Sequence, residues 1–378
     1  MPDTQSITVN ELKPKKTNLL GFSRETLHNY FSNLGEKPFR ANQLMQWIHQ
    51  RGITDFDEMT NISKQLRSKL KDIACVELAE LKVLQKSSDG TRKWLISVSG
   101  VENSIESVLI PEKGRNTLCI SSQVGCTLNC SFCSTARQGF NRNLTSAEII
   151  SQLFMAHHTL RKEGIENGVT NVVFMGMGEP LLNFDAVIEA IKIMGDDFSY
   201  GLSKRRITLS TAGVVPAIYK LAEHTDVSLA ISLHASNDAL REKLVPINKK
   251  YPIHQLLDAC RQYVADGLRR RITFEYVMLK GVNDSLEDAK QLVKLLRDVP
   301  SKLNLIPFNP FPDAGYERST NKDIDTFREY VMSKGIITVT RRPRGDDIDA
   351  ACGQLVGKVK DRSRRSMKMA KQQTSEVA

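Results

Sequence analysis

The chain has 378 residues, of which 40% are hydrophobic and 25% charged, as in an ordinary globular protein with one large and one smaller domain. No apolar run in the sequence reaches the length of a membrane span, and the polar N-terminus lacks the apolar segment of a secretory signal, so we expect a cytoplasmic protein. The net charge of +10 favours a polyanionic partner such as nucleic acid, although a basic surface can also serve solubility alone.

The N-terminal residues 1–17 are predicted to form a flexible tail, and residues 18–91 a small helical accessory domain. Apolar residues recur at helical spacing in two stretches, and a third helix is expected near 63–71. The two stretches contain Leu27, Tyr30, Phe31 and Leu34, then Leu44, Trp47 and Ile48. The basic residues of this domain, among them Arg40 and Arg51, leave two interpretations open: a packing domain, or a domain that contacts RNA.

Residues 92–115 are predicted to be strands that link the helical domain to the main one. Trp94, Ile96 and Val98 alternate with polar neighbours, and a second extended run covers 105–110. A turn signal at 87–90 precedes them. The change from helical to alternating spacing marks the boundary between the two parts.

Residues 116–341 alternate between strand and helix patterns, as in a parallel sheet with a helix after each strand. The predicted strands are 117–121, 170–175, 206–211, 227–233, 271–279, 303–307 and 336–340. The predicted helices lie near 146–162, 184–194, 214–223, 252–266, 285–297 and 321–333. Six such units indicate an α/β fold, either a barrel or a partial barrel.

Polar or glycine-rich residues follow several of these strands directly. Residues 176–180 follow the second strand, 210–213 the third and 232–234 the fourth, and Asn309 follows the sixth. Because the chemistry of such folds lies at the carboxyl ends of the strands, we expect these segments to gather at one rim.

The loop after the first strand contains Cys126, Cys130 and Cys133 in the spacing C-x3-C-x2-C. Three thiolates on one loop can hold a soft metal centre. A [4Fe–4S] cluster normally takes four cysteines, so three would leave one iron open to a group that is not protein. Structural zinc would need a fourth ligand, either Cys119 or a histidine. The odd total of seven cysteines argues against a secreted disulfide scaffold.

Residues 342–378 are predicted to form a loop that ends in a basic tail. The tail contains Lys358, Lys360, Arg362, Arg364, Arg365, Lys368 and Lys371. This tail and the basic runs at 204–206, 269–271 and 341–342 either are solvated or bind phosphates.

The cysteine motif, with Phe132 before its last cysteine and its place after the first strand, resembles that of radical S-adenosylmethionine (radical SAM) enzymes. The flanking sequence is similar to the RlmN family of bacterial RNA methyltransferases, which act on C2 of adenine. The segments that carry the resemblance are LGEKPFR (34–40), TLCISSQVGC (117–126), FCSTA (132–136), QGFNRN (138–143), FMGMGEPLLN (174–183) and GDDIDAACGQ (345–354). The resemblance covers nearly the whole chain and implies a partial (β/α)6 radical SAM barrel behind the helical accessory domain.

The resemblance implies one [4Fe–4S] cluster, ligated by Cys126, Cys130 and Cys133, with S-adenosylmethionine at the open iron and two molecules of it used in each turnover. The residues that it assigns to cofactor binding are Gly178, Glu179, Ser210, Ser232, Leu233, His234 and Asn309. The implied substrates are 23S rRNA, at the peptidyl-transferase centre, and a subset of tRNAs, at the adenosine 3′ of the anticodon. A flavodoxin is the expected electron donor, and we expect a monomer.

Three catalytic residues are implied by the same resemblance. Cys352 would carry the methyl group as S-methylcysteine and form a covalent adduct with the RNA, Glu106 would accept the C2 proton, and Cys119 would release the product through a transient disulfide with Cys352. A radical route is needed because C2, between two ring nitrogens, is too electron-poor to attack a sulfonium methyl group. Cys75 and Cys260 lie in apolar helical contexts and are interpreted as packing residues.

Two alternatives remain open from the sequence. A related group of enzymes methylates C8 of adenine with the same cluster and the same two outer cysteines, and only the closeness of the flanking sequence favours C2. The second alternative is an RNA-binding protein without catalysis, in which the cysteines hold structural zinc.

Overall fold

The computed structural model describes residues 16–98, 103–265, 271–312 and 314–357. The predicted basic tail after 357, most of the predicted N-terminal tail, and Arg269 and Arg270 lie outside these ranges. Within the described residues no helix is long and apolar enough to cross a membrane.

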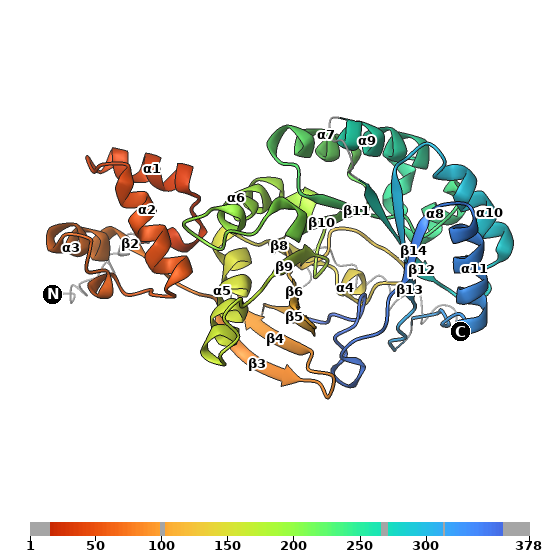
Figure 1. Ribbon diagram of the computed structural model, residues 1–378, viewed down its shortest axis with the longest axis horizontal. Coiled ribbons are helices and arrows are strands. Elements are labelled where there is room, and N and C mark those ends of the chain that lie inside the picture. Colours follow the sequence, from red (N-terminus) through yellow and green to blue (C-terminus); the bar gives the residue numbers. More distant parts are fainter. Residues whose placement is uncertain (1–15, 99–102, 266–270, 313, 358–378) are drawn as a thin grey trace, which may run out of the picture.

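One mixed sheet forms the main body, with strand order β14-β13-β12-β11-β10-β9-β6-β5-β4-β3 (Figure 1). Its parallel strands are β6 (Arg115–Cys119), β9 (Asn171–Phe174), β10 (Ile207–Thr211), β11 (Ser228–Ser232), β12 (Ile272–Met278), β13 (Ser301–Pro307) and β14 (Ile337–Thr340). The connecting helices are α5 (Ser146–Lys162), α6 (Phe184–Gly195), α7 (Val215–His224), α9 (Ile253–Ala265), α10 (Leu286–Leu295) and α11 (Asn321–Ser333). The predicted order of strands and helices is confirmed, and in the described residues the sheet stays open between β14 and β3, as in a partial barrel.

Local chemistry explains why these elements form where the sequence indicates. Val172, Val173 and Phe174 of β9 are all buried, which is the continuous apolar run expected of a parallel strand covered by helices. Helix α5 begins at a capping box, in which Glu148 N donates to Thr145 Oγ1 (3.2 Å) and Thr145 N donates to Glu148 Oε2 (2.9 Å). Both signals are local, so they can be read without the tertiary structure.

The linking strands differ from their prediction in extent. They comprise β3 (Glu80–Lys86), β4 (Arg92–Ser97) and β5 (Ser104–Glu112), so the extended region begins well before residue 92. Every residue of β3 is exposed, including the apolar Leu81 and Val83, so this strand has no buried face. Because β5 pairs antiparallel with β6, these strands extend the main sheet rather than forming a separate linker.

The helical N-terminal domain contains α1 (Arg24–Asn33), α2 (Phe39–Met45) with a following π-helical turn (Gln46–Gln50), and α3 (Lys64–Ile73). The short strands β1 (Thr17–Asn18) and β2 (Ala74–Cys75) pair beside them. This domain lies next to α5 and α6 (Figure 1). Ser146 Oγ of α5 donates to the carbonyl of Gly21 (2.8 Å), and Ser23 N donates to Glu189 Oε1 of α6 (2.7 Å).

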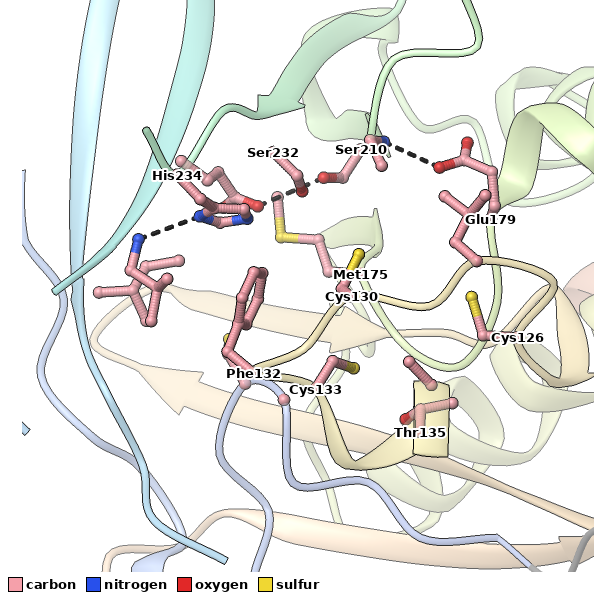
Figure 2. A pocket seen from close by; sticks show the side chains of 18 of the residues that line it. Cys126, Cys130, Phe132, Cys133, Thr135, Met175, Glu179, Ser210, Ser232 and His234 are labelled. Carbon is pink, nitrogen blue, oxygen red and sulfur yellow. Dashed lines mark hydrogen bonds between the residues drawn. The ribbon is translucent and has the colours of Figure 1, made fainter. Parts of the chain in front are cut away.

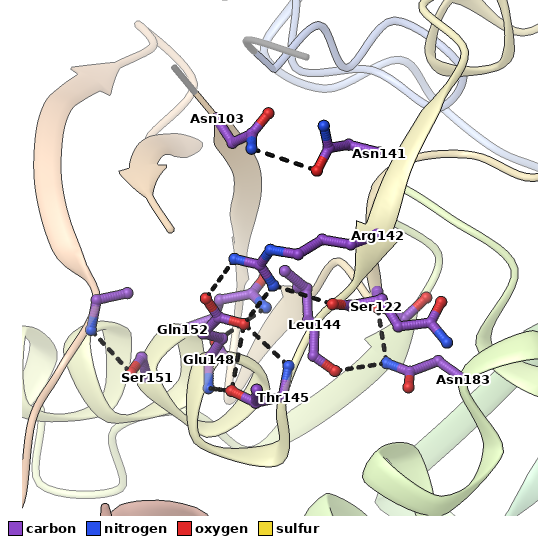
Figure 3. Close-up of polar contacts among 12 residues, drawn as sticks. Asn103, Ser122, Asn141, Arg142, Leu144, Thr145, Glu148, Ser151, Gln152 and Asn183 are labelled. Carbon is purple, nitrogen blue, oxygen red and sulfur yellow. Dashed lines mark hydrogen bonds and ion pairs between the residues drawn. The ribbon is translucent and has the colours of Figure 1, made fainter. Parts of the chain in front are cut away.

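Amide side chains hold the segment that leads from β6 to the cysteine loop (Figure 3). Gln152 of α5 accepts from Ser121 N (2.8 Å) and donates to Ser121 O (2.9 Å). Asn183 donates to the carbonyls of Ser122 (2.9 Å) and Leu144 (2.8 Å). Two further elements complete this region, the hairpin β7 (Gln123–Gly125) and β8 (Phe140–Asn143), and the short helix α4 (Ser134–Arg137). The cysteine loop therefore starts and ends on a fixed frame.

Three histidines lie where the N-terminal domain meets the core. His49 is buried, its Nδ1 lies 3.4 Å from the hydroxyl of Tyr200, and its carbonyl is 3.1 Å from His158 Nε2. The ring of His157 packs edge-on against both His158 and Tyr200. Burial lowers the pKa of His49 to about 3 and the pKa values of His157 and His158 to about 4. All three imidazoles are therefore neutral in the fold at pH 7.

We predict that acid weakens this junction. In the unfolded chain the imidazoles have pKa values near 6.5 and bind protons between about pH 6.5 and 4, which the folded protein does not, so stability falls as the pH falls through that range. His49→Phe removes one of the three groups and should reduce the loss of melting temperature between pH 7.5 and 5.5. Thermal unfolding followed by circular dichroism measures this loss. The exposed His254→Phe is the matched control, and an equal reduction in that variant would contradict the assignment.

Candidate active site

The carboxyl ends of the parallel strands and the cysteine loop enclose a first cavity (Figure 2). The predicted residues that line it are Cys126, Cys130, Cys133, Gly178, Glu179, Ser210, Ser232, His234, Asn309 and Cys352. Leu233 is instead fully buried in the hydrophobic core beside the cavity. Segments that are up to about two hundred residues apart in the sequence thus meet at one rim, because parallel strands end on the same edge of a sheet.

The cysteine loop folds tightly around its three sulfurs. Cys126 N donates to Gly139 O (2.8 Å), and Cys133 N donates to Cys130 O (3.2 Å). Burial raises the pKa values of the Cys130 and Cys133 thiols, and the neighbouring cysteines raise that of Cys130 further. Three thiolates in this cavity need a positively charged centre beside them, and an iron–sulfur cluster provides one. The donor set therefore fits a cluster that is held by three cysteines.

Structural zinc and an iron–sulfur cluster require different arrangements of ligands. Zinc in such sites is surrounded by four converging ligands. In the described part of the chain, no group of three or more His, Cys, Asp or Glu side chains is arranged to hold a single metal ion. A cluster differs, since each of its irons takes its own sulfur ligand.

Glycines bring the second loop against the first. Gly178 has φ +99°, and a Cβ placed on it would lie 2.5 Å from Gln123 Cβ. A Cβ on Gly176 would lie 2.6 Å from the carbonyl oxygen of Ile120. Larger residues do not fit at either position, and the close approach lets Glu179 N donate to Gln123 Oε1 (3.0 Å).

Glu179 presents a buried carboxylate to the cavity. Its oxygens accept hydrogen bonds from Ala212 N (2.8 Å) and Leu181 N (3.1 Å). Burial raises the pKa of Glu179 to about 6, although these hydrogen bonds lower it. The group is therefore mainly ionised at pH 7.5 and is suited to bind an ammonium group.

His234 is a neutral hydrogen-bond donor at the opposite wall. It has φ +59°, and its Nδ1 accepts a hydrogen bond from Val277 N (3.0 Å), so its proton is on Nε2. Burial, and then the charge of Arg241, lower its pKa to about 3. Its ring packs edge-on against Phe132 at 4.6 Å between centroids, which joins the fourth strand to the cysteine loop.

Arg241 hydrogen-bonds to the ends of two strands. It was not predicted as a site residue. It lies on α8 (Asp238–Leu244), an element that was not predicted, and it is fully buried. Its guanidinium donates to the carbonyls of Ala212 (2.7 Å), Ser232 (3.0 Å) and Leu233 (3.1 Å). Burial lowers its pKa to about 10, so it remains charged at neutral pH. Nothing in the local pattern of a short charged helix distinguishes such an arginine from a surface residue.

A second cavity adjoins the first, and Cys352 lines both. Its volume is ≈ 470 Å³, compared with ≈ 160 Å³ for the first. Cys119 lies on its wall, and burial, followed by the charge of Cys352, raises the pKa of the Cys119 thiol. Its basic residues are Arg115, Arg341, Arg342 and Arg344. None of the seven cysteines forms a disulfide in the structure, so Cys119 and Cys352 face the same cavity as separate thiols.

Arg341 contacts the sulfur of Cys352. Its Nη1 donates to Cys352 Sγ (3.4 Å), and its Nη2 lies 3.6 Å from Glu275 Oε1. Glu275 also accepts from Ser210 Oγ (3.3 Å), and Asn309 Nδ2 donates to the carbonyl of Cys352 (3.3 Å). Burial lowers the pKa of Arg341, but the charges of Cys352 and Glu275 outweigh this and raise it. In the sequence, Arg341 is prominent only as part of the basic run at 341–342. Glu275 was not predicted, because its only signal is a single charge inside an apolar strand.

Glu106 is not brought into contact with the other predicted catalytic residues. It lies on β5 and lines neither cavity. Its carboxylate is buried, with Oε1 3.3 Å from Lys93 Nζ, and Oε2 accepts from Val356 N (2.9 Å).

Comparisons with known proteins agree with this arrangement. A family model described as "Ribosomal RNA large subunit methyltransferase N-terminal domain", the RlmN N-terminal domain, matches residues 17–76, and the "Radical SAM superfamily" model matches residues 120–296. The crystal structure of a radical SAM methyltransferase from Sphaerobacter thermophilus is 40% identical, with a TM-score of 0.83, over 90% of this chain and 99% of that one.

Two other solved structures are less similar. SuiB from Streptococcus suis, bound to S-adenosylmethionine, is 16% identical with a TM-score of 0.44, over 61% of this chain and 52% of that one. A domain of a pyruvate-formate lyase-activating enzyme from Bacteroides vulgatus is 18% identical with a TM-score of 0.36, over 46% of this chain and 99% of that one. On the full-length match and the two family models, the chain belongs to the RlmN-type family of radical SAM methyltransferases, which implies S-adenosylmethionine and a [4Fe–4S] cluster as cofactors.

Proposed function

We propose that this enzyme methylates C2 of adenine in 23S rRNA, at the peptidyl-transferase centre, and in a subset of tRNAs, at the adenosine 3′ of the anticodon. The observation that carries the proposal is the position of Cys352, whose side chain belongs to both cavities. One sulfur can thus take up a methyl group on the cofactor side and present it on the RNA side. The enzyme acts in the cytoplasm as a monomer and receives electrons from a flavodoxin.

The first cavity is the cofactor site. Cys126, Cys130 and Cys133 hold the cluster. S-adenosylmethionine is held by Gly178, Glu179, Ser210, Ser232, His234 and Asn309, with Glu179 accepting hydrogen bonds from its amino group and His234 donating from Nε2. Leu233, which is buried in the core, would support these residues by packing behind them. When bound, the cluster and S-adenosylmethionine together supply the radical that removes a hydrogen atom from a methyl group.

The Cys352 thiolate is the methyl acceptor. The Arg341 guanidinium donates to its sulfur, so a positive charge lies beside the atom that attacks the methyl group. After one hydrogen atom has been removed from the methyl group on Cys352, the resulting carbon adds to C2 and links the enzyme to the RNA.

Release of the product requires base and thiol chemistry. Glu106 accepts the C2 proton, and because its carboxylate is held by Val356 N and Lys93, this role requires the segment after Cys352 to move first. Cys119 then attacks Cys352 Sγ. A sulfur–sulfur bond forms as the carbon–sulfur bond to the RNA breaks, and the released carbon takes up a proton to become the methyl group. The unpaired electron left by the radical addition would return to the oxidised iron–sulfur centre. The enzyme is then left as a disulfide that must take up two electrons, supplied by the flavodoxin, before the next turnover.

The second cavity is the site of the target nucleotide. Its four arginines suit phosphate oxygens. They come from two segments that are far apart in the sequence, since Arg115 begins β6 and Arg344 follows β14. The basic residues of the N-terminal domain would add contacts to RNA outside the cavity. A C8-adenine methyltransferase would use the same two cysteines, so the position of the methyl group has to be measured.

We predict that the cluster-loaded enzyme, incubated anaerobically with S-adenosylmethionine, reductant and fragments of 23S rRNA or tRNA, produces 2-methyladenosine. Mass spectrometry of the digested nucleosides against both methyladenosine standards measures the outcome. Formation of 8-methyladenosine alone would replace the C2 assignment with C8. Zinc in place of iron in anaerobically purified protein, with no methylated product, would replace catalysis with RNA binding alone.

Cys119→Ala should stop the reaction after the adduct has formed, because the thiol that attacks Cys352 Sγ is missing. We expect a covalent protein–RNA species linked through Cys352, visible as a shifted band on denaturing gels and as a nucleotide-bearing peptide by mass spectrometry. Cys352→Ala should give neither adduct nor product. Methylated RNA released at the normal yield by Cys119→Ala would refute the role of Cys119.

Arg341→Met should slow the first methyl transfer to Cys352, since a charge-assisted hydrogen bond to a reacting atom is worth about tenfold or more in rate. Intact-protein mass spectrometry without RNA follows the methylation of Cys352 over time. Arg328→Met, which breaks an exposed ion pair with Asp325 on α11, is the matched control. Equal rates in the Arg341 and Arg328 variants would show that the guanidinium does not assist the thiolate.

A further inference from the structure

We infer that the buried ion pair of Lys93 and Glu106 is a clamp that holds both ends of the Cys352 segment, residues 349–356, and so positions Cys352 between the two cavities. The inference rests on the proposed function for the meaning of that position. The clamp gives Lys93 a positioning role. It gives Glu106 a positioning role as well, which comes before any transfer of a proton to its carboxylate.

The pair stands on adjacent antiparallel strands. Lys93 belongs to β4 and Glu106 to β5, and their charged atoms are 3.3 Å apart. Lys93 is 7% exposed and Glu106 6%. Removing two charges from water is costly, and an apolar pair of similar volume is often at least as stable. The stability of the sheet alone therefore does not explain why a charged pair is buried at this position.

Each member of the pair also holds the segment that contains Cys352. Lys93 Nζ donates to the carbonyl of Asp349 (3.3 Å), three residues before the cysteine. Glu106 Oε2 accepts from Val356 N (2.9 Å), four residues after it. The two ends of the segment are thus joined through one pair of side chains, and Cys352 lies between the two attachment points.

The segment needs such attachments because it has little regular structure of its own. No helix or strand covers residues 349–357. Asp349 has φ +48°, a left-handed conformation that a residue with a side chain adopts only when its surroundings hold it. A Cβ on Gly357 would lie 2.2 Å from the carbonyl of Ser104, so the segment runs directly against the start of β5.

Between the two attachment points the segment is fastened to the cysteine loop. Ser134 N donates to the carbonyl of Gly353 (2.8 Å), and Thr135 Oγ1 donates to the carbonyl of Leu355 (2.8 Å). The Cys352 segment is therefore hydrogen-bonded to the clamp at its two ends and to the cysteine loop and the helix after it between those ends. Release of the clamp would free the ends of the segment, and this is the movement that the proton-acceptor role of Glu106 requires.

Two variants of Glu106 separate the clamp from the proton-acceptor role. Glu106→Ala removes the acceptor for Val356 N, whereas Glu106→Gln keeps an oxygen there but cannot act as a base. We expect amide hydrogen exchange in residues 349–357 of the cluster-loaded protein to rise about tenfold in Glu106→Ala and to stay within about threefold of the parent protein in Glu106→Gln. The first methylation of Cys352, measured without RNA, should slow in the alanine variant and be restored in the glutamine variant.

Further variants guard against a general loss of folding. The double change Lys93→Met and Glu106→Leu replaces the pair with apolar side chains, so we expect it to keep the melting temperature and still to increase exchange in 349–357. Glu80→Ala, which breaks an exposed ion pair with Lys82 on the same sheet, is the matched control and should change neither measurement. Iron content and exchange in residues 126–133 should be the same in all variants.

The outcomes distinguish the clamp from the proposed function. Unchanged exchange in both Glu106→Ala and the double variant would overturn the clamp, whatever product the parent enzyme makes. Increased exchange with slower Cys352 methylation would support it even if the methylated nucleoside proved to be 8-methyladenosine. Full RNA methylation by Glu106→Gln would remove the proton-acceptor role and leave the clamp as the function of this residue.

Discussion

The parallel register of β6, β9, β10 and β11 is the constraint on which the site depends. Cys119 pairs with Val173, Leu209 with Phe174, and Ser210 with Ala230, so the strands end at nearly the same level. Each loop that follows therefore enters the same space from a neighbouring position. The glycines of 176–178 and the buried Arg241 then fix the distance between the loops. Without this register the chemically important segments would be scattered over the surface of the domain.

The second organising feature is the return of the chain after β14. The segment around Cys352 runs back across the site and meets the cysteine loop, the antiparallel strands and Asn309. The proposed methyl transfer through Cys352 requires that one sulfur react first with the cofactor and then with the RNA. A short stretch without regular structure, held by replaceable hydrogen bonds, meets that requirement better than a strand or helix, because it can change position without disrupting the core.

The buried charges described around the site are balanced either by an opposite charge or by hydrogen bonds. Glu275 faces Arg341, Glu106 faces Lys93, and Arg241 is surrounded by carbonyl oxygens. Such groups are costly to bury, and each is here balanced by charge or by hydrogen bonds. Their common effect is orientation, since each joins two segments that touch a cavity. The antiparallel strands β4 and β5 contribute to this orientation, because Lys93 and Glu106 hydrogen-bond to the segment that contains Cys352.

The sequence by itself determined those features whose signals are local. The spacing of three cysteines, the capping box of α5, and the apolar runs of the parallel strands all act over a few residues, and together with the resemblance they indicated the fold, the cofactors and the loops of the first cavity. The edge strand β3 escaped prediction because it has no buried face, and α8 because a short charged helix resembles a surface loop.

Only the tertiary structure decided which distant side chains meet. It placed Cys352 on both cavities, Arg341 against its sulfur, and Glu106 with Lys93 beneath the same segment, away from either cavity. No pattern in one sequence could show these contacts, because they depend on how the chain after β14 packs across strands that lie some 250 residues earlier. The type of a residue and its neighbours in the sequence indicate which reactions it can perform. The packing of the fold decides which distant residues it contacts.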